Sequence, residues 1–128
     1  MFEQITKGIK IAVKSNYNGM ILHDGNHYHA FSYLISITNT SKETVQLLKR
    51  YWTINDSLHN TEKIEGPGVV GETPIIPPNK QYKYTSNCFL QSTAGSMFGS
   101  YKMINIDTNE AFLVRIPKFQ LFTTSMLN

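Results

Sequence analysis

The stretch Ala30–Asn39, A-F-S-Y-L-I-S-I-T-N, repeats with a period of two residues, and this period decides the fold class. Aromatic or β-branched residues occupy every second position, at Phe31, Tyr33, Ile35 and Ile37. Mostly small polar residues lie between them. Successive side chains of a strand point to opposite faces of a sheet, so the stretch predicts a β-strand with one apolar face.

Similar stretches recur on both sides of this one. They are rich in β-branched or aromatic residues and comprise Ile9–Val13, Val45–Ile54, Gln81–Ser86, Gly99–Ile104 and Phe112–Ile116. Turn sequences such as D-G-N, N-D-S and P-P-N separate them, and no convincing amphipathic helix occurs. About six or seven short strands at this spacing predict an all-β antiparallel β-sandwich, with a small barrel as the alternative. Pro117 suggests an edge or a strand end, and the polar stretch Ser15–Asn26 suggests a mobile loop.

The bulk composition is that of an ordinary globular domain. The chain has 128 residues, 41% of them hydrophobic and 16% charged, which is enough for one domain with a substantial core. The 12 Lys and Arg residues against 9 Asp and Glu are scattered, which favours a solvated surface over nucleic-acid binding. The single cysteine, Cys88, excludes an internal disulfide framework, and no signal-like or membrane-spanning segment is found. We therefore expect a cytoplasmic protein with no membrane and no nucleic-acid partner.

The stretch Ile64–Pro74, I-E-G-P-G-V-V-G-E-T-P, contains the spacing G-x-G-x-x-G at Gly66, Gly68 and Gly71. In dinucleotide-binding folds, a helix follows these glycines and presents its N-terminus to the pyrophosphate. Three prolines between residues 74 and 78 exclude that helix here. Two uses of the loop remain: positive-φ turns between strands, which we favour, or a nest of backbone N–H groups that binds an anion.

Three histidines lie close together in H-D-G-N-H-Y-H, at positions His23, His27 and His29. In an extended chain His27 and His29 share a face, so two of the three could share a metal, and His23, His27 and His29 are the candidate ligands. The segment is polar and turn-like, and no further ligand with regular spacing follows. We therefore expect a solvated loop and assign no metal or other cofactor.

Two charged residues lie inside apolar, strand-like runs. Arg50 precedes Tyr51 and Trp52, and Glu65 follows Ile64. Because buried charges are rarely unpaired, we expect a structural Arg50–Glu65 ion pair, with anion binding by Arg50 as the less favoured use. No sequence signature supplies a base for Cys88, so a packed thiol is expected there and no catalytic residue is assigned.

Several blocks, in order, resemble the bacterial ApaG family over about residues 5–122. They are V-Q-L-L-K-R-Y-W-T-I, I-E-G-P-G-V-V-G-E-T-P, Y-K-Y-T-S, G-S-M-F-G-S-Y-K-M and F-L-V-R-I-P-K-F-Q-L. The first strand also fits the family pattern F-x-Y-x-I-x-I-x-N, which ends at Asn39. The resemblance implies a single ApaG-like domain over residues 1–128, with an immunoglobulin/fibronectin type III-like β-sandwich. It departs from the family at Pro67, where Glu is common, and at Pro78-Asn79, where a P-G turn is usual.

The resemblance also implies an association with cobalt and magnesium efflux, without an established reaction, and a role in protein interaction. We therefore expect a non-enzymatic cytosolic module that acts through an unknown protein partner in a pathway linked to divalent cations. A homodimer is possible through an exposed edge strand. One alternative is a phosphate- or nucleotide-binding protein or phosphohydrolase that uses the glycine loop. Another is a metal-binding protein that uses the three histidines.

Overall fold

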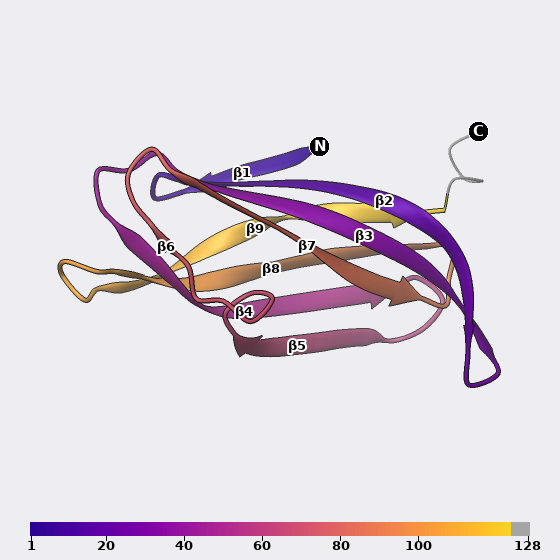
Figure 1. Cartoon of the computed structure of the whole chain (residues 1–128). Helices are drawn as coiled ribbons and strands as arrows, with labels where there is room; N and C mark the ends of the chain where they lie inside the picture. Colours follow the sequence, from indigo (N-terminus) through magenta and orange to yellow (C-terminus); the bar gives the residue numbers. More distant parts are fainter. Residues whose placement is uncertain (124–128) are drawn as a thin grey trace.

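The structure is a computed structural model that describes residues 1–123. These residues form nine strands and no helix (Figure 1). The strands are β1 (Phe2–Thr6), β2 (Ile9–His23), β3 (Asn26–Asn39), β4 (Val45–Asp56), β5 (Thr61–Pro67), β6 (Ile75–Ile76), β7 (Gln81–Leu90), β8 (Ala94–Asn105) and β9 (Ala111–Phe122). No helix within residues 1–123 could therefore cross a membrane.

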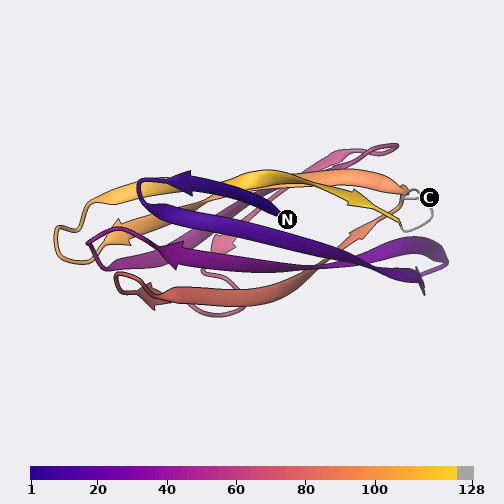
Figure 2. The ribbon, with the colours of Figure 1, turned by 90° about the horizontal axis from the view of Figure 1, so that it is seen from above.

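The strands form two antiparallel sheets, which are stacked face to face (Figures 1 and 2). The first sheet has the order β1-β2-β3-β7, and the second has the order β5-β4-β8-β9, with β6 paired to β4. The predicted antiparallel β-sandwich is therefore confirmed. The strands are longer and more numerous than expected, because several continue through the polar stretches that resemble loops in the sequence.

The core follows the period-two pattern. Phe31, Tyr33, Ile35 and Ile37 of β3 are all buried, with at most 5% of each residue exposed. They meet buried residues of the second sheet, among them Leu47, Tyr101, Met103, Val114, Ile116 and Phe119. Each large apolar side chain removed from water contributes about 1.5–3 kcal/mol, so this inner layer is the main source of stability.

The stretch Ser15–Asn26 is not a mobile loop, and that prediction is wrong. It continues β2 to His23, and the register with β3 runs to the pair His23–Asn26. Asp24 and Gly25 form the two-residue turn with φ of 49° and 79°, the conformation that suits a tight hairpin. Backbone pairing with the neighbouring strand requires no buried apolar face, which is why a stretch without an alternating apolar pattern can form this strand.

Pro117 lies within β9 rather than at its end. Its strand is an edge of the second sheet, as the sequence suggests, and the register with β8 shifts between Met97 and Gly99. Met97 pairs with Phe119, whereas Gly99 pairs with Ile116, so β9 has an extra residue at this point. A β-bulge tolerates proline because the extra residue needs no ladder hydrogen bond.

One side of the sandwich is closed and the other is open. On the closed side β1 lies beside β9, and the Arg115 backbone N–H donates to Thr6 Oγ1 at 3.2 Å. On the open side β5 and β7 are sheet edges. The outer face of the second sheet is therefore bordered by β1 on one side and by the exposed strand β5 on the other.

Candidate functional site

The glycine loop is folded back on itself by backbone hydrogen bonds. The Val69 N–H donates to Glu72 O at 2.8 Å, and the Glu72 N–H donates to Val69 O at 2.9 Å. The Gly68 N–H donates to Leu48 O at 2.8 Å, which ties the loop to the end of β4. These three amides are engaged and are not available to a phosphate group. The structural use of the loop fits this geometry better than an anion-binding nest does.

Two of the three glycines have the backbone conformation that the turn hypothesis predicts. Gly68 has φ of 59° and Gly71 has φ of 81°. A Cβ added at Gly68 would lie 2.1 Å from Glu72 O, whereas one added at Gly71 would meet nothing within 4 Å. Gly66 differs, because it lies in β5 opposite Arg50. The spacing G-x-G-x-x-G thus combines two positive-φ turn positions, Gly68 and Gly71, with one position, Gly66, where the Arg50 side chain lies close to the backbone.

Arg50 holds the loop from the neighbouring strand. Its Nη1 donates to Pro67 O at 2.8 Å and to Gly68 O at 3.0 Å. A Cβ at Gly66 would lie 3.0 Å from Arg50 Nη2, so the glycine leaves the space that the guanidinium occupies. Carbonyl oxygens therefore surround the guanidinium, and its role is to brace the loop.

The predicted Arg50–Glu65 ion pair is wrong. In the register of β4 and β5, Arg50 is opposite Gly66 and Glu65 is opposite Tyr51. Neighbouring positions of a strand point to opposite faces, so the two side chains lie on different sides of the sheet. Glu65 is exposed on the outer face, while two carbonyl oxygens satisfy the half-buried Arg50.

The three histidines lie on the hairpin of β2 and β3. His29 Nδ1 and the Tyr17 hydroxyl share a hydrogen bond of 2.8 Å. His23 Nε2 is 3.3 Å from Asp24 Oδ2, and both side chains are more than 70% exposed. His27 pairs with Leu22 across the hairpin. Within residues 1–123, no three His, Cys, Asp or Glu residues are placed to hold one metal ion. The sequence predicts a solvated loop for the histidines, but they lie on two paired strands whose tip is exposed to solvent.

Cys88 is the packed thiol that the sequence predicts. Only 4% of the residue is exposed. Burial, together with the negative charges of Asp56 and Glu62, raises the pKa of the thiol to about 12. A thiol that stays protonated at neutral pH is a poor nucleophile, which fits a packing role for Cys88.

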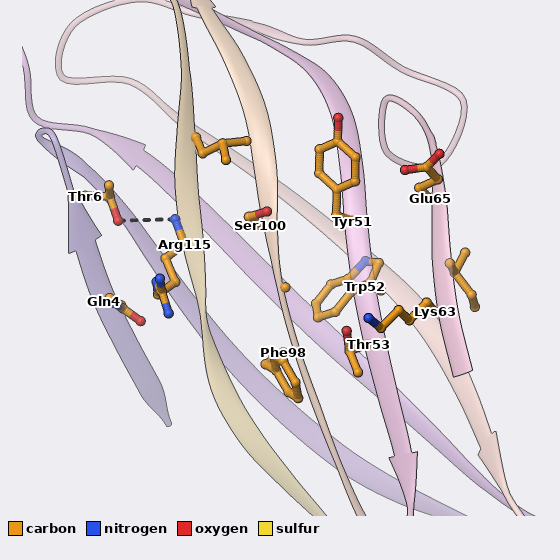
Figure 3. A pocket seen from close by; sticks show the side chains of 13 residues that line it. Gln4, Thr6, Tyr51, Trp52, Thr53, Lys63, Glu65, Phe98, Ser100 and Arg115 are labelled. Carbon is orange, nitrogen blue, oxygen red and sulfur yellow. Dashed lines mark hydrogen bonds between the residues drawn. The ribbon is translucent and has the colours of Figure 1, made fainter. Parts of the chain in front are cut away.

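A groove of about 810 Å³ crosses the outer face of the second sheet, and the sequence analysis misses it (Figure 3). Gln4 and Thr6 of β1 lie on one side of the groove, next to Arg115 of β9. Lys63 and Glu65 of β5 lie on the other side. The one sequence signal for it is Leu113, an apolar residue at an outward position of the alternating stretch in β9.

The tip of the β2–β3 hairpin is a second exposed surface, and residues 20–28 are here called the arm. The pairing of β3 with β7 begins at His29, so the arm has no strand partner except itself. It extends past the ends of the other strands (Figures 1 and 2). Met20, Ile21 and Leu22 are 57%, 41% and 66% exposed. Adjacent strand residues face opposite ways, so each face of the arm carries at least one exposed apolar side chain.

Comparison with known proteins gives one consistent result. Residues 22–105 match the family described as the ApaG domain. The chain is 38% identical to Protein ApaG of Paramagnetospirillum magneticum, over 94% of this chain and 92% of that protein. It is 35% identical to Protein ApaG of Acidithiobacillus ferrooxidans over the full length of both chains.

Solved structures agree with these sequence relatives. An X-ray structure of a structural-genomics target has a TM-score of 0.88 and 37% identity, and the match covers 94% of this chain and 91% of that one. A crystal structure of an ApaA protein from Bordetella pertussis has a TM-score of 0.83 and 29% identity, and the match covers 91% of this chain and 94% of that one. The chain belongs to the ApaG family.

Proposed function

We propose that this protein is a non-enzymatic cytoplasmic interaction module that acts through a protein partner in a pathway linked to cobalt and magnesium handling. The observation that carries the proposal is the arm. Three consecutive large aliphatic residues, Met20 to Leu22, are exposed at the end of a hairpin that no other strand covers. Met20 and Leu22 lie on one face of the arm and Ile21 on the other, and exposed apolar side chains grouped on an uncovered hairpin are typical of a contact site for another macromolecule.

The buried reactive groups support a binding role. The Cys88 thiol is kept protonated by burial, and Arg50 is engaged by loop carbonyls. The pKa of the Tyr84 hydroxyl is raised above its ordinary value, chiefly by burial, so this group is also inert at neutral pH. The surface features are apolar or cationic, and such features suit contacts with a partner.

Site-specific photo-cross-linking in living bacteria tests the proposal. A photoreactive benzoylphenylalanine replaces Leu22 in the arm, and the control carries it at Leu58, which is 81% exposed at the turn between β4 and β5. We expect discrete cross-linked products from position 22 that the unlabelled wild-type protein suppresses by competition. Products of equal yield from both positions would contradict the role of the arm. A cross-link to a second copy of the chain would identify the partner as a homodimer subunit.

Growth in cobalt tests the link to divalent cations. In a bacterium that lacks its own ApaG protein, the wild-type chain is expected to restore tolerance to cobalt. The double variant Ile21→Ser/Leu22→Ser is expected to fail, and Leu58→Ser is expected to succeed as the matched control. Full restoration by the arm variant would separate the arm from this function. No change in tolerance with the wild-type chain would remove the cation pathway from the proposal.

A further inference from the structure

The outer face of the second sheet carries the positive charge of the protein. Its outward positions hold five cations and a single acid, Glu65. The cations are Lys49, Lys63, Lys102, Arg115 and Lys118. This face therefore has a formal charge of +4, while the whole chain has +3, so the remaining charged residues together carry −1.

Within residues 1–123, no ion pair neutralises these cations. Among residues 1–123, the ion pairs are Lys10 with Glu3 and His23 with Asp24, and neither lies on this face. Lys118 Nζ lies over the Phe98 ring, 5.8 Å from its centre. Positive charges concentrated on one concave face attract an anionic partner and raise its association rate.

Apolar side chains lie between the cations. Phe98 and Leu113 are 40% and 58% exposed, and with Tyr51 they line the groove. Lys63 and Arg115 lie on opposite sides of the groove, on β5 and β9 (Figure 3). The register places Arg115 in one row with Ser100, Tyr51 and Glu65, so Lys63 lies three strand spacings across and two residues along from it. With strands about 4.8 Å apart and a rise of about 3.4 Å per residue, the two backbone positions are about 16 Å apart, a span of about five extended residues.

We propose that this groove binds an extended acidic peptide segment of a partner protein. Apolar side chains of the segment contact Phe98 and Leu113, and carboxylates of the segment meet Lys63 and Arg115. This inference goes beyond the function proposed for the arm, because it concerns a different surface and specifies the chemistry of the partner.

The groove suits a peptide better than a single-stranded nucleic acid. Binding of unpaired bases relies on aromatic rings with open faces on which bases stack. The Lys118 ammonium group lies over the Phe98 ring, Leu113 is aliphatic, and Tyr51 is a single ring where a run of stacked bases needs several. An aliphatic or aromatic side chain of a peptide needs apolar contact only, which both residues supply.

Fluorescence anisotropy with the full chain tests the proposal. The probe is a labelled peptide of about twelve residues, with Leu-Phe at its centre and glutamates on both sides, a length that covers the span between the two cations. We expect saturable binding that the double variant Lys63→Glu/Arg115→Glu weakens at least about tenfold. The matched control Lys42→Glu/Lys80→Glu reverses two exposed lysines elsewhere and is expected to change the dissociation constant less than about twofold.

A second pair of variants tests the apolar contact. Leu113→Ser is expected to weaken probe binding about fivefold, and Leu58→Ser to leave it unchanged. A probe with Ser-Ser at its centre is expected to bind the wild type as weakly as the intact probe binds Leu113→Ser. Circular dichroism and thermal melting of every variant confirm that the fold is retained.

Several outcomes would overturn the proposal. The first is a dissociation constant weaker than about 1 mM for the probe. The second is equal weakening by the two double charge reversals, which would indicate a nonspecific charge effect. The third is tighter binding of a twelve-residue oligothymidylate with the same dependence on Lys63 and Arg115, which would assign the groove to nucleic acid. The arm variant Ile21→Ser/Leu22→Ser should bind the probe as the wild type does, so failure of one proposal can be told from failure of the other.

Discussion

Tyr84 of β7 and Tyr101 of β8 share a hydrogen bond between their hydroxyl groups, and this bond joins the two sheets inside the core. Tyr101 is fully buried and Tyr84 is 8% exposed. Each hydroxyl therefore depends on the other for its partner away from water. A buried polar group that loses its hydrogen-bond partner lowers the stability of the protein more than an exposed one, because water cannot replace the lost partner.

Removal of both hydroxyls is expected to destabilise the protein by less than the sum of the two single removals. Tyr101→Phe or Tyr84→Phe leaves one buried hydroxyl unpaired and is expected to lower the free energy of unfolding by about 1–3 kcal/mol. The double variant is expected to lose less than the sum of the two single losses. Urea unfolding measures all three, with Tyr82→Phe on the same strand as the control. Strictly additive losses would show that the hydroxyls do not interact.

The two positive-φ glycines of the loop are expected to differ in their response to alanine. Gly71→Ala adds a Cβ in open space and is expected to cost only the backbone strain, about 1 kcal/mol. Gly68→Ala places a Cβ 2.1 Å from Glu72 O, so it is expected to cost about 2 kcal/mol or more in addition. Denaturant midpoints of the two variants make the comparison. Equal losses would mean that the turn relaxes freely around residue 68.

Arg50 is expected to stabilise the loop through its hydrogen bonds to carbonyl oxygens. Arg50→Ala is expected to lower the free energy of unfolding by about 1.5–3 kcal/mol, the range for hydrogen bonds that involve a charged group. Glu65→Ala is expected to change it by less than about 0.5 kcal/mol, as for an exposed residue away from such contacts. A large loss with Glu65→Ala would restore the ion pair that the register excludes.

Stability is expected to fall in alkaline solution. Burial raises the pKa of the Cys88 thiol to about 12 and raises those of Tyr33, Tyr84 and Tyr101 above their ordinary value. Above the ordinary pKa values, the unfolded chain loses these protons while the folded protein retains them. The free energy of unfolding is therefore unaffected by these four groups below about pH 8.5. Above that pH it decreases, by up to about 1.4 kcal/mol per pH unit for each group.

Urea unfolding between pH 7 and pH 11 checks this dependence. The Cys88 thiol has the lowest ordinary pKa of the four groups, so Cys88→Ala is expected to remove the earliest part of the decrease, between about pH 8.5 and pH 10. The tyrosine part is expected to remain in that variant. An unfolding free energy that stays constant up to pH 11 would show that the folded protein releases these protons freely.

The fold could be predicted from the sequence because buried residues recur at every second position within a single strand. In β3 the alternation from Phe31 to Ile37 identifies both the strand and its inner face, and the structure confirms each of these positions as buried. The arm has no such pattern, since Met20, Ile21 and Leu22 are consecutive and all exposed. Its strands are fixed by pairing with each other and by the turn at Asp24 and Gly25, which a search for buried faces misses.

The candidate surfaces depend on register, and register could not be read from one sequence. The sequence marks Arg50 as unusual, but its partner follows from the pairing of Arg50 with Gly66 rather than with Glu65. Lys63 and Arg115 belong to strands that are distant in the chain and meet across one groove only after β4 and β8 lie between them. The turns at Gly68 and Gly71 could be predicted, because positive φ is a local property of the backbone.

The hydrogen bond between Arg115 and Thr6 has a consequence for how the protein is made. It joins positions 109 residues apart, and the strands that carry them border the same groove. During synthesis β1 leaves the ribosome before its neighbour β9, and all the other strands emerge between them. Contacts between such distant segments form slowly, because the intervening chain must be ordered before they can close. The closed side of the sandwich therefore forms only once β9 has emerged, and a nascent chain that lacks β9 leaves the outer edge of β1 without this neighbour.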